Sequence, residues 1–284
     1  MAAASPQLYQ LYARCIPSGE CLLCPAGGRS IVYGPFASRR RGLSIGVNLF
    51  PLAKVCSFNC VYCFRGPTSV LTAEPVDDGS GVTAQVLVKA LEIAIEEVAG
   101  VLVDVSSIDF SGRGEPTLHP RFGELLEAVK LFAKSRRLDV SIGVFTNSST
   151  LNREGVVRAL ESVDYVEAKL DTALQHKFEA INMPHRALSI DMVVKGLRSF
   201  RKRFGGALVV QTMLLSYGDL NNHSSEDSEA LAQELVAIEP DAVHLYTVYR
   251  TPRKQGVKKA GREAMESFAK ALRRCGLVVE VYPE

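Results

Sequence analysis

Strand-like and helix-like stretches alternate along most of the chain, and this alternation constrains its fold most strongly. Apolar residues spaced three or four positions apart predict helices, and short β-rich runs between them predict strands. Counted from the first strand, there are six strand–helix repeats. Such repeats imply a parallel sheet with right-handed crossovers, either open and doubly wound or closed into a complete or partial barrel. We expect strands at 43–49, 106–110, 140–145, 165–170, 208–215, 242–248 and 277–282 and helices at 83–99, 121–134, 153–162, 191–203, 226–238 and 261–274.

The chemically distinctive residues follow the ends of these strands. In α/β folds, sites form at the carboxyl ends of the strands, so the loops after the first four strands should meet at one mouth. These loops carry, in chain order, Cys56–Cys63, Gly112–Pro116, Thr146–Asn147 and Asp171.

The loop after the first strand contains Cys56, Cys60 and Cys63 in a C-x3-C-x2-C spacing, with Tyr62 before the last cysteine. Three thiolates can hold an iron–sulfur cluster and leave one iron open to a small molecule. A zinc site would need a fourth ligand, and His119 and His176 lie far away in sequence. The run therefore favours an iron–sulfur cluster.

A second group of cysteines, Cys15, Cys21 and Cys24, lies upstream of the first strand. Grouped cysteines indicate metal binding more readily than a disulfide framework in a cytosolic chain. A second iron–sulfur cluster, a zinc site and reduced thiols all stay open here. We expect residues 1–30 to form an N-terminal Cys-rich extension and residues 31–284 the core. Cys275 is expected to be a small buried side chain on an apolar helix face.

The composition, with 47% hydrophobic and 23% charged residues, is ordinary for a globular protein. There is no apolar run long enough to span a bilayer, and the first residues lack the basic-then-apolar pattern of a secretory signal. We therefore expect a cytoplasmic protein without membrane contact.

Positive charge is concentrated near the N-terminus. Residues 1–70 carry a formal charge of +6, against +2 for the whole chain. A basic face suits a phosphate-bearing substrate such as RNA, and a solvated surface balanced by acids elsewhere is the alternative. Arg39–Arg41 are candidates for phosphate contact. The basic runs at 201–203 and 253–259 are expected to be solvated helix ends.

With these motifs in place, the chain resembles the radical S-adenosylmethionine (SAM) superfamily. The resemblance implies a partial (β/α)6 barrel with a four-iron four-sulfur cluster on Cys56, Cys60 and Cys63. The open iron would chelate the amino and carboxylate groups of SAM. One-electron reduction, with electrons from a donor such as a ferredoxin or flavodoxin, would then yield methionine and a 5′-deoxyadenosyl radical.

The same resemblance assigns the cofactor-binding residues. Gly112-Arg113-Gly114-Glu115-Pro116 resembles a Gly-Gly-Glu-Pro segment whose backbone pairs with the SAM amino group, with Arg113 as a departure. Thr146-Asn147-Ser148 resembles a Thr-Asn-Gly turn. Lys169 and Asp171 would contact the ribose or carboxylate, although Asp171 could equally cap a turn. Tyr62 completes this set, and Gln211 and Met213 face either the adenosyl group or the core.

A narrower resemblance, to a prokaryotic group related to the tRNA wyosine (imidazoG) synthases, implies tRNA as the substrate and a second cluster on the upstream trio. A glycyl-radical-activating-type enzyme and a non-catalytic iron–sulfur or RNA-binding protein are the alternatives. The segments that carry this resemblance are Tyr33–Asn48, Ser111–His119, Leu170–Thr172, Ile181–His185 and Arg250–Pro252.

Overall fold

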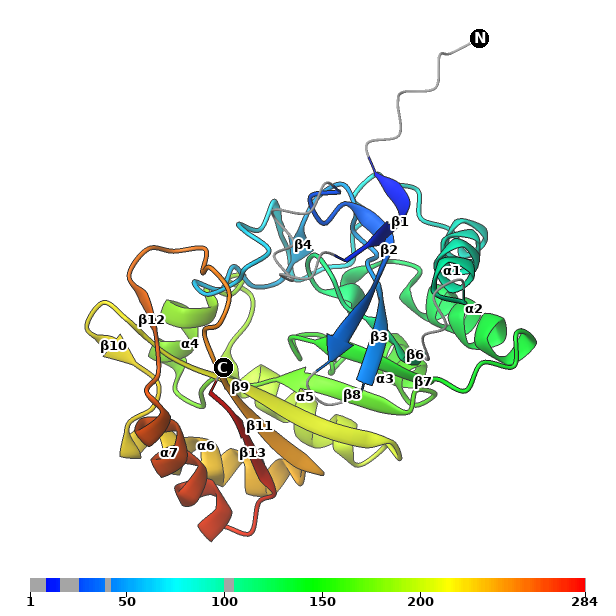
Figure 1. The fold of residues 1–284 in the computed structure, drawn as a ribbon. Coiled ribbons are helices and arrows are strands. Elements are labelled where there is room, and N and C mark those ends of the chain that lie inside the picture. The colour runs from blue at the N-terminus through cyan, green and yellow to red at the C-terminus, as the bar shows by residue number, and fades with distance from the viewer. Residues whose placement is uncertain (1–8, 16–25, 39–41, 100–104, 284) are drawn as a thin grey trace.

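One large sheet forms the centre of the molecule. A computed structural model describes residues 9–15, 26–38, 42–99 and 105–283. Over these residues the sheet has 11 strands in the order β1-β2-β3-β6-β7-β8-β9-β11-β13, with β10 and β12 each paired to β9 (Figure 1). The strands of this sheet are β1 (Gln10–Arg14), β2 (Ser30–Ser38), β3 (Gly42–Val47), β6 (Val105–Phe110), β7 (Ser141–Thr146), β8 (Tyr165–Lys169), β9 (Ala207–Tyr217), β10 (Leu220–Asn221), β11 (Ala242–Thr247), β12 (Val257–Lys259) and β13 (Val279–Tyr282).

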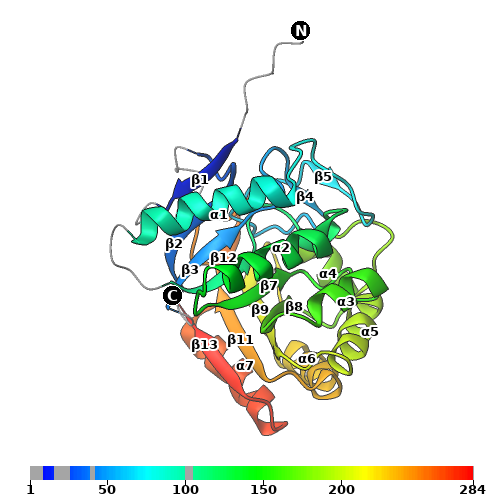
Figure 2. The same cartoon turned by 90° about the vertical axis from the view of Figure 1, so that its right-hand side faces the viewer.

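Helices connect the successive parallel strands and cover one face of the sheet. Figure 2 shows α1 and α2 in front of the strands and α3, α5 and α6 beside them. Sequential helices also contact one another, from α1 to α2 to α3 and from α5 to α6 to α7. The helical elements are α1 (Ala84–Ala99), η1 (Pro116–Leu118), α2 (Phe122–Ser135), α3 (Glu154–Leu160), α4 (Gln175–Asn182), α5 (Ile190–Arg201), α6 (Ser225–Ile238) and α7 (Arg262–Arg274).

The strands β3, β6, β7, β8, β9 and β11 form a partial barrel. Each pairs in parallel with the next. The barrel is open, because β2 flanks β3 at one edge and β13 flanks β11 at the other. This confirms the predicted α/β fold with a partial (β/α)6 barrel.

The two faces of the barrel strands differ because side chains alternate along a strand. On the helix-facing side, Ile45 lies beside Ile108 and Ile108 beside Ile142, all buried in the main apolar core. On the opposite side, Ser44 lies beside Ser107, and their hydroxyl groups are 2.7 Å apart. The packing of apolar strand faces against the helices therefore fixes where the strand ends, and their loops, lie.

The N-terminal part of the sheet goes beyond the predicted repeats. β2 runs antiparallel to β3, and β1 joins the edge of the sheet in parallel with β2. Since β1 belongs to residues 1–30, the described part of that segment continues the sheet. The division of the chain at residue 30 stays a prediction.

Cys275 differs from its expected role. It is exposed at the C-terminal end of α7, where the buried stripe of that helix ends with Leu272. The apolar pattern places residues up to Leu272 against the sheet, and Cys275 lies just past the helix.

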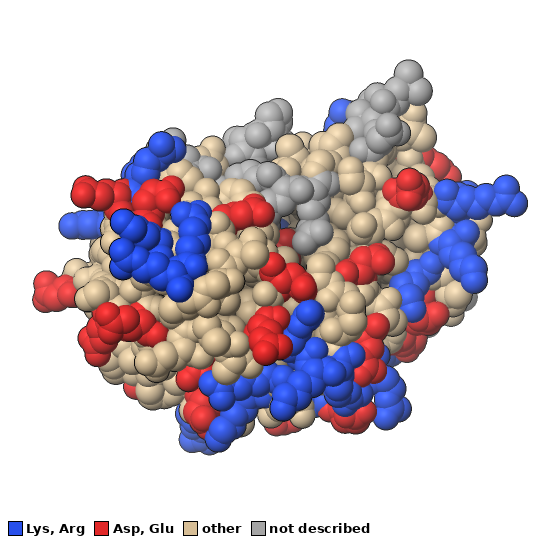
Figure 3. Space-filling model, turned by 90° about the horizontal axis from the view of Figure 1, so that it is seen from below, with Lys and Arg blue, Asp and Glu red and all other residues tan. Residues whose placement is uncertain are grey.

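Charged side chains of both signs are mixed on the face of the molecule that Figure 3 shows from below. The basic run at 201–203 is paired with acids, because Arg201 pairs with Asp241 and Arg203 pairs with Glu154 and Glu161. These partly exposed ion pairs account for that run as a solvated helix end. In the described part of the chain, no helix combines the length and apolar character that crossing a membrane requires.

Candidate functional site

The Cys56–Cys63 loop follows β3 at the mouth of the barrel. Cys56 ends a two-residue strand, β4 (Val55–Cys56), which pairs in parallel with β5 (Val70–Leu71). Cys56 is 8% exposed, while Cys60 and Cys63 are partly exposed. A tight turn joins the last two, since the amide of Cys63 donates to the carbonyl of Cys60 at 3.2 Å. The three thiols are thus held on one short, ordered loop.

Helix α4 supports this loop from its C-terminal end. The last carbonyls of a helix lack partners within the helix. Here the amide of Val61 donates to Ile181 O at 2.9 Å, and the amide of Asn59 donates to Asn182 O at 3.0 Å. The cysteine loop and the end of α4 therefore satisfy each other's backbone groups.

Each of the three cysteine sulfurs has a nitrogen donor from a different part of the chain. Lys54 Nζ lies 3.0 Å from Cys63 Sγ. Asn147 Nδ2 lies 3.5 Å from Cys56 Sγ, and Asn182 Nδ2 lies 3.6 Å from Cys60 Sγ. The sulfurs are thus surrounded by groups that stabilise negative charge.

The donor set fits an iron–sulfur cluster better than a single metal ion. Within the described ranges, no three His, Cys, Asp or Glu side chains converge closely enough to hold one ion. A cluster takes one thiolate at each of several irons, so its ligands stand further apart. Burial, with the nearby Cys63 and Asp171, raises the pKa of the Cys60 thiol to about 11. Burial likewise raises the pKa of Cys56. Such thiols become thiolates when a positive centre binds them.

The Gly112–Pro116 loop packs its backbone directly against the cysteine loop. The amide of Glu115 donates to Val55 O at 2.8 Å. Gly114 has φ +86°, and a Cβ there would lie 1.8 Å from Val55 O. Gly112, at φ +114°, would place a Cβ 2.7 Å from that of Asn48. Both positions therefore require glycine.

Arg113, the departure from an all-glycine segment, lies between these glycines. Its backbone amide donates to Asn48 Oδ1 at 3.0 Å, and its side chain reaches Pro51 O at 3.4 Å. Burial and the nearby charges of Arg65 and Arg29 lower its pKa. The side chain therefore turns aside from Gly112 and Gly114 without disturbing the turn.

Glu115 is buried and ties two of the mouth loops together. Its carboxylate accepts from the hydroxyl groups of Thr117 at 2.6 Å and Thr146 at 2.8 Å and from the amide of Asn147 at 2.6 Å. Burial raises its pKa, and these hydrogen bonds oppose the rise. Pro116, at the start of η1, follows directly. Glu115 thus orients Asn147, whose side chain reaches Cys56.

The Thr146-Asn147-Ser148 turn has Ser148 where the resembling motif has glycine. Ser148 adopts φ 70°, the left-handed conformation that a glycine would enter more readily. Its hydroxyl donates to Lys169 O at 2.9 Å, which fastens the turn to the end of β8. This hydrogen bond therefore stabilises Ser148 in a left-handed conformation that glycine adopts more readily.

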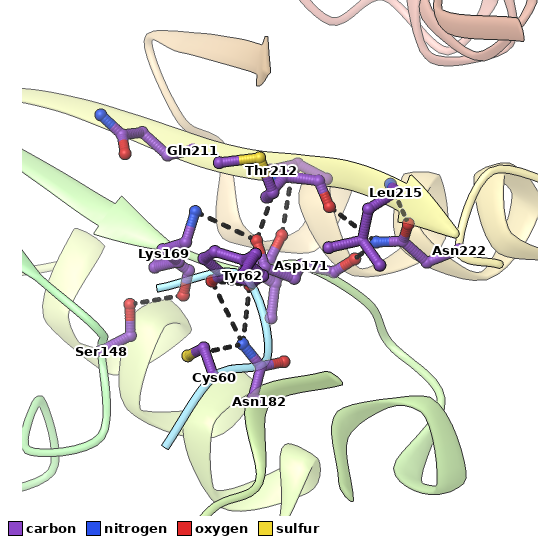
Figure 4. A network of polar contacts seen from close by, with 12 residues as sticks. Cys60, Tyr62, Ser148, Lys169, Asp171, Asn182, Gln211, Thr212, Leu215 and Asn222 are labelled. Atoms are coloured by element: carbon purple, nitrogen blue, oxygen red, sulfur yellow. Dashed lines mark hydrogen bonds and ion pairs between the residues drawn. The ribbon is translucent and has the colours of Figure 1, made fainter. Parts of the chain in front are cut away.

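Asp171 acts as a brace between four segments, not as an open acceptor. Figure 4 shows it among Tyr62, Lys169 and Asn182. One carboxylate oxygen accepts from the Met213 amide at 2.8 Å and lies 3.2 Å from Lys169 Nζ. The other accepts from the Tyr62 hydroxyl and from Asn182 Nδ2.

Asp171 is only 3% exposed, and protein donors occupy both oxygens of its carboxylate. These contacts come from distant segments and do not form a turn cap, and the expected ribose contact stays a prediction.

Lys169, by contrast, is partly accessible at the mouth. Its ammonium group lies 5.2 Å from the centre of the Tyr62 ring, and 19% of its side chain is exposed. On β9, Gln211 donates to Glu167, and Met213 contacts Asp171 through its backbone. Lys169 therefore lies next to Tyr62 of the cysteine loop, whereas Gln211 is engaged with Glu167.

Three residues at this site were not predicted from the sequence: Lys54, Asn182 and Arg253. Arg253, expected at a solvated helix end, instead donates to Asn59 O at 2.6 Å and Cys60 O at 3.2 Å. That expectation was wrong for Arg253, because this residue lies on a loop that contacts the cysteine loop, whereas Lys258 and Lys259 are exposed on β12. Asn182 stands in a segment that carried the family resemblance, and Lys54 lies two residues before Cys56, so position alone could have drawn attention to both.

Only part of the upstream trio can be placed. Cys15 follows β1, and its amide donates to Gly34 O at 3.1 Å. Cys21 and Cys24, like Arg39–Arg41, lie outside the described residues. A second cluster stays a prediction.

Comparison with known proteins finds a family model, relatives and solved structures that are similar to this chain. The model of the radical SAM superfamily matches residues 50–223. UPF0026 protein MJ1312 of Methanocaldococcus jannaschii is 31% identical over 229 residues, which is 81% of this chain and 67% of that protein. The chain thus spans about two thirds of the length of this relative. The match is to a UPF0026 protein and does not extend to the wyosine synthases as such.

Two solved structures share the fold. A radical SAM methyltransferase from Sphaerobacter thermophilus has a TM-score of 0.66 at 18% identity, covering 86% of this chain and 67% of its own. Streptococcus suis SuiB bound to S-adenosylmethionine has a TM-score of 0.57 at 16% identity, covering 84% and 50%. At these identities the likeness concerns the fold alone.

Proposed function

The chain belongs to the radical SAM superfamily and is a relative of the UPF0026 proteins, and we propose that it cleaves SAM reductively at a four-iron four-sulfur cluster. Cys56, Cys60 and Cys63 hold this cluster. One observation carries the proposal: three thiols of one loop stand at the barrel mouth without converging on a single ion, each beside a nitrogen donor.

When bound, the cluster supplies the electron that splits SAM into methionine and a 5′-deoxyadenosyl radical. The residues of this chain supply placement. Gly112 and Gly114, which carry no Cβ atoms, let this loop pack closely against Asn48 and Val55, and the backbone of the loop would pair with the SAM amino group. Lys169 offers an ammonium group to the SAM carboxylate, and Tyr62 an aromatic face beside it. Asn147 links this region to Cys56.

The test is product formation under reducing, oxygen-free conditions. Reconstituted protein with dithionite and SAM should release 5′-deoxyadenosine and methionine, measured by mass spectrometry. Cys56→Ala should lose this product. Cys275→Ala is the matched control, because Cys275 is exposed beyond α7. Equal product from the wild type and Cys56→Ala would favour a non-catalytic protein instead.

For the substrate, we propose a tRNA base, from which the radical abstracts hydrogen. The resemblance of Tyr33–Asn48 and Ile181–His185 to the wyosine-related group supports it, as does the positive charge of residues 1–70. A ferredoxin or flavodoxin would supply electrons in the cytoplasm. Modified nucleosides in tRNA from a deletion strain, compared with its parent, test this substrate. An unchanged nucleoside profile would contradict it and leave SAM cleavage untouched.

A further inference from the structure

Lys54 is a buried cation with an unusual pair of partners. Lys54 is only 2% exposed. Its Nζ donates to Gly66 O at 2.7 Å and to Cys63 Sγ at 3.0 Å. Among the described residues, these are its hydrogen-bond partners, and none is a carboxylate. Burying a charge without a counter-charge is unfavourable because the charge loses its hydration, so such charges are normally paired.

The counter-charge can come from the ligand that this loop is expected to hold. Three cysteine thiolates and their cluster carry net negative charge, which increases by one on reduction. The Lys54 ammonium group lies against one of those sulfurs. Its burial is therefore explained once Cys63 is a thiolate in a cluster.

The side-chain nitrogen donors to the three sulfurs differ in strength. Asn147 and Asn182 offer neutral amide groups at 3.5 and 3.6 Å, whereas Lys54 offers a charged group at 3.0 Å. Charge-assisted hydrogen bonds are roughly twice as strong as neutral ones. Lys54 should therefore influence the electronic state of the cluster more than either asparagine does.

We propose that Lys54 is a positioning residue that raises the reduction potential of the cluster, because its buried positive charge lies beside the Cys63 sulfur. This rests on the proposed function. A positive charge stabilises the more negative, reduced state, and hydrogen bonds to cluster sulfurs are among the factors that set such potentials. The contact of Nζ with Gly66 O holds the ammonium group in place against the sulfur.

The first experiment is a redox titration of the reconstituted cluster, followed by electron paramagnetic resonance. Lys54→Met should shift the midpoint potential to more negative values, with at least a tenfold fall in the equilibrium constant of reduction, about 59 mV for a one-electron couple. Lys54→Arg keeps the charge and should recover most of the wild-type potential. Asn147→Ala and Asn182→Ala should give smaller shifts in the same direction.

Lys130→Met is the matched control, because it removes a lysine charge that pairs with Glu127 on the surface of α2. Its potential should equal that of the wild type. A Lys54→Met potential equal to that of Lys130→Met overturns the proposal. A wild type that assembles no cluster would instead overturn the proposed function, so the two failures are distinguishable.

A second measurement needs no variant and decides the matter if Lys54→Met does not assemble a cluster. In wild-type protein labelled with 15N-lysine, pulsed electron paramagnetic resonance of the reduced cluster should detect coupling to a 15N nucleus, because Nζ donates directly to a ligand sulfur. Absence of that coupling in a protein that holds its cluster overturns the proposal.

Discussion

The carboxylate of Glu115 accepts a hydrogen bond from the backbone amide of Asn147 at 2.6 Å, so this buried acid joins the loops after β6 and β7. The carboxylate acts only as an acceptor: its described hydrogen bonds come from backbone N–H groups and from threonine hydroxyl groups. Glutamine in its place would turn an amide N–H toward one of these donors. The geometry of the turn that presents Asn147 to Cys56 therefore depends on a charged or at least acceptor-only side chain.

We expect Glu115→Gln to lower the free energy of unfolding by about 2 kcal/mol, the usual cost of a buried donor left without its acceptor. Chemical denaturation measures this. Glu127→Gln, which removes an exposed charge paired with Lys130, should cost less than about 1 kcal/mol. Similar losses in the two variants would show that Glu115 does not hold the loops together.

Gly114→Ala should prevent the Gly112–Pro116 loop from packing on the cysteine loop. The new Cβ would clash with Val55 O, and φ is positive. Gly155→Ala is the matched control, since Gly155 lies in α3 with open space around it, and it should stabilise the protein by roughly 0.5–1 kcal/mol. Iron content after reconstitution and thermal unfolding are the readouts. An iron content in Gly114→Ala equal to that of Gly155→Ala would argue against the close packing.

The main elements could be predicted because their apolar residues repeat at the period of a helix or strand. Ile108 and Phe110 alternate on β6, and Leu87, Leu91 and Ala94 share one face of α1. Helix α4 was missed, because its buried side includes Lys177 and Asn182. Polar residues at core positions hide the apolar period on which such predictions depend.

The residues of the candidate site likewise differ in whether the sequence alone could predict them. Cys56, Cys60 and Cys63 are ligand types at a local spacing, so the sequence alone indicates their chemistry. Asn182 meets Cys60 across 122 positions of the chain. Such a contact depends on how α4 docks on the loop, and no local pattern encodes that. The same holds for Asp171, whose environment of donors comes from distant segments.

Tyr62→Phe should destabilise the brace around Asp171. The substitution removes the hydroxyl group that donates to the buried carboxylate but keeps the ring beside Lys169. Loss of a hydrogen bond to a charged group costs about 1.5–3 kcal/mol. Tyr249→Phe, at a residue that is 70% exposed, should leave the free energy of unfolding unchanged. A Tyr62→Phe protein as stable as Tyr249→Phe would mean that the hydroxyl group does not contribute to the brace.

His119 should make stability depend on pH in the acidic range. It is buried, and its Nδ1 accepts from the Arg121 amide at 3.2 Å, so protonation of Nδ1 would break this hydrogen bond. Burial lowers its pKa below the ordinary 6.5, and the charge of Arg121 adds to this, whereas Asp77, Asp78 and Glu124 oppose it. Below pH 6.5, His119 is therefore protonated more readily in the unfolded chain than in the folded protein.

The resulting stability is complete above the unfolded-state pKa and is lost as the pH falls toward the lower folded-state pKa. We expect the free energy of unfolding to decrease as the pH is lowered from 6.5, the ordinary value, and the slope to be smaller in His119→Gln. His176→Gln, at an exposed position on α4, should keep the wild-type slope. Chemical denaturation at a series of pH values gives each slope. Since other acids titrate equally in all three proteins, a slope in His119→Gln as steep as in His176→Gln would assign the pH dependence to those acids instead.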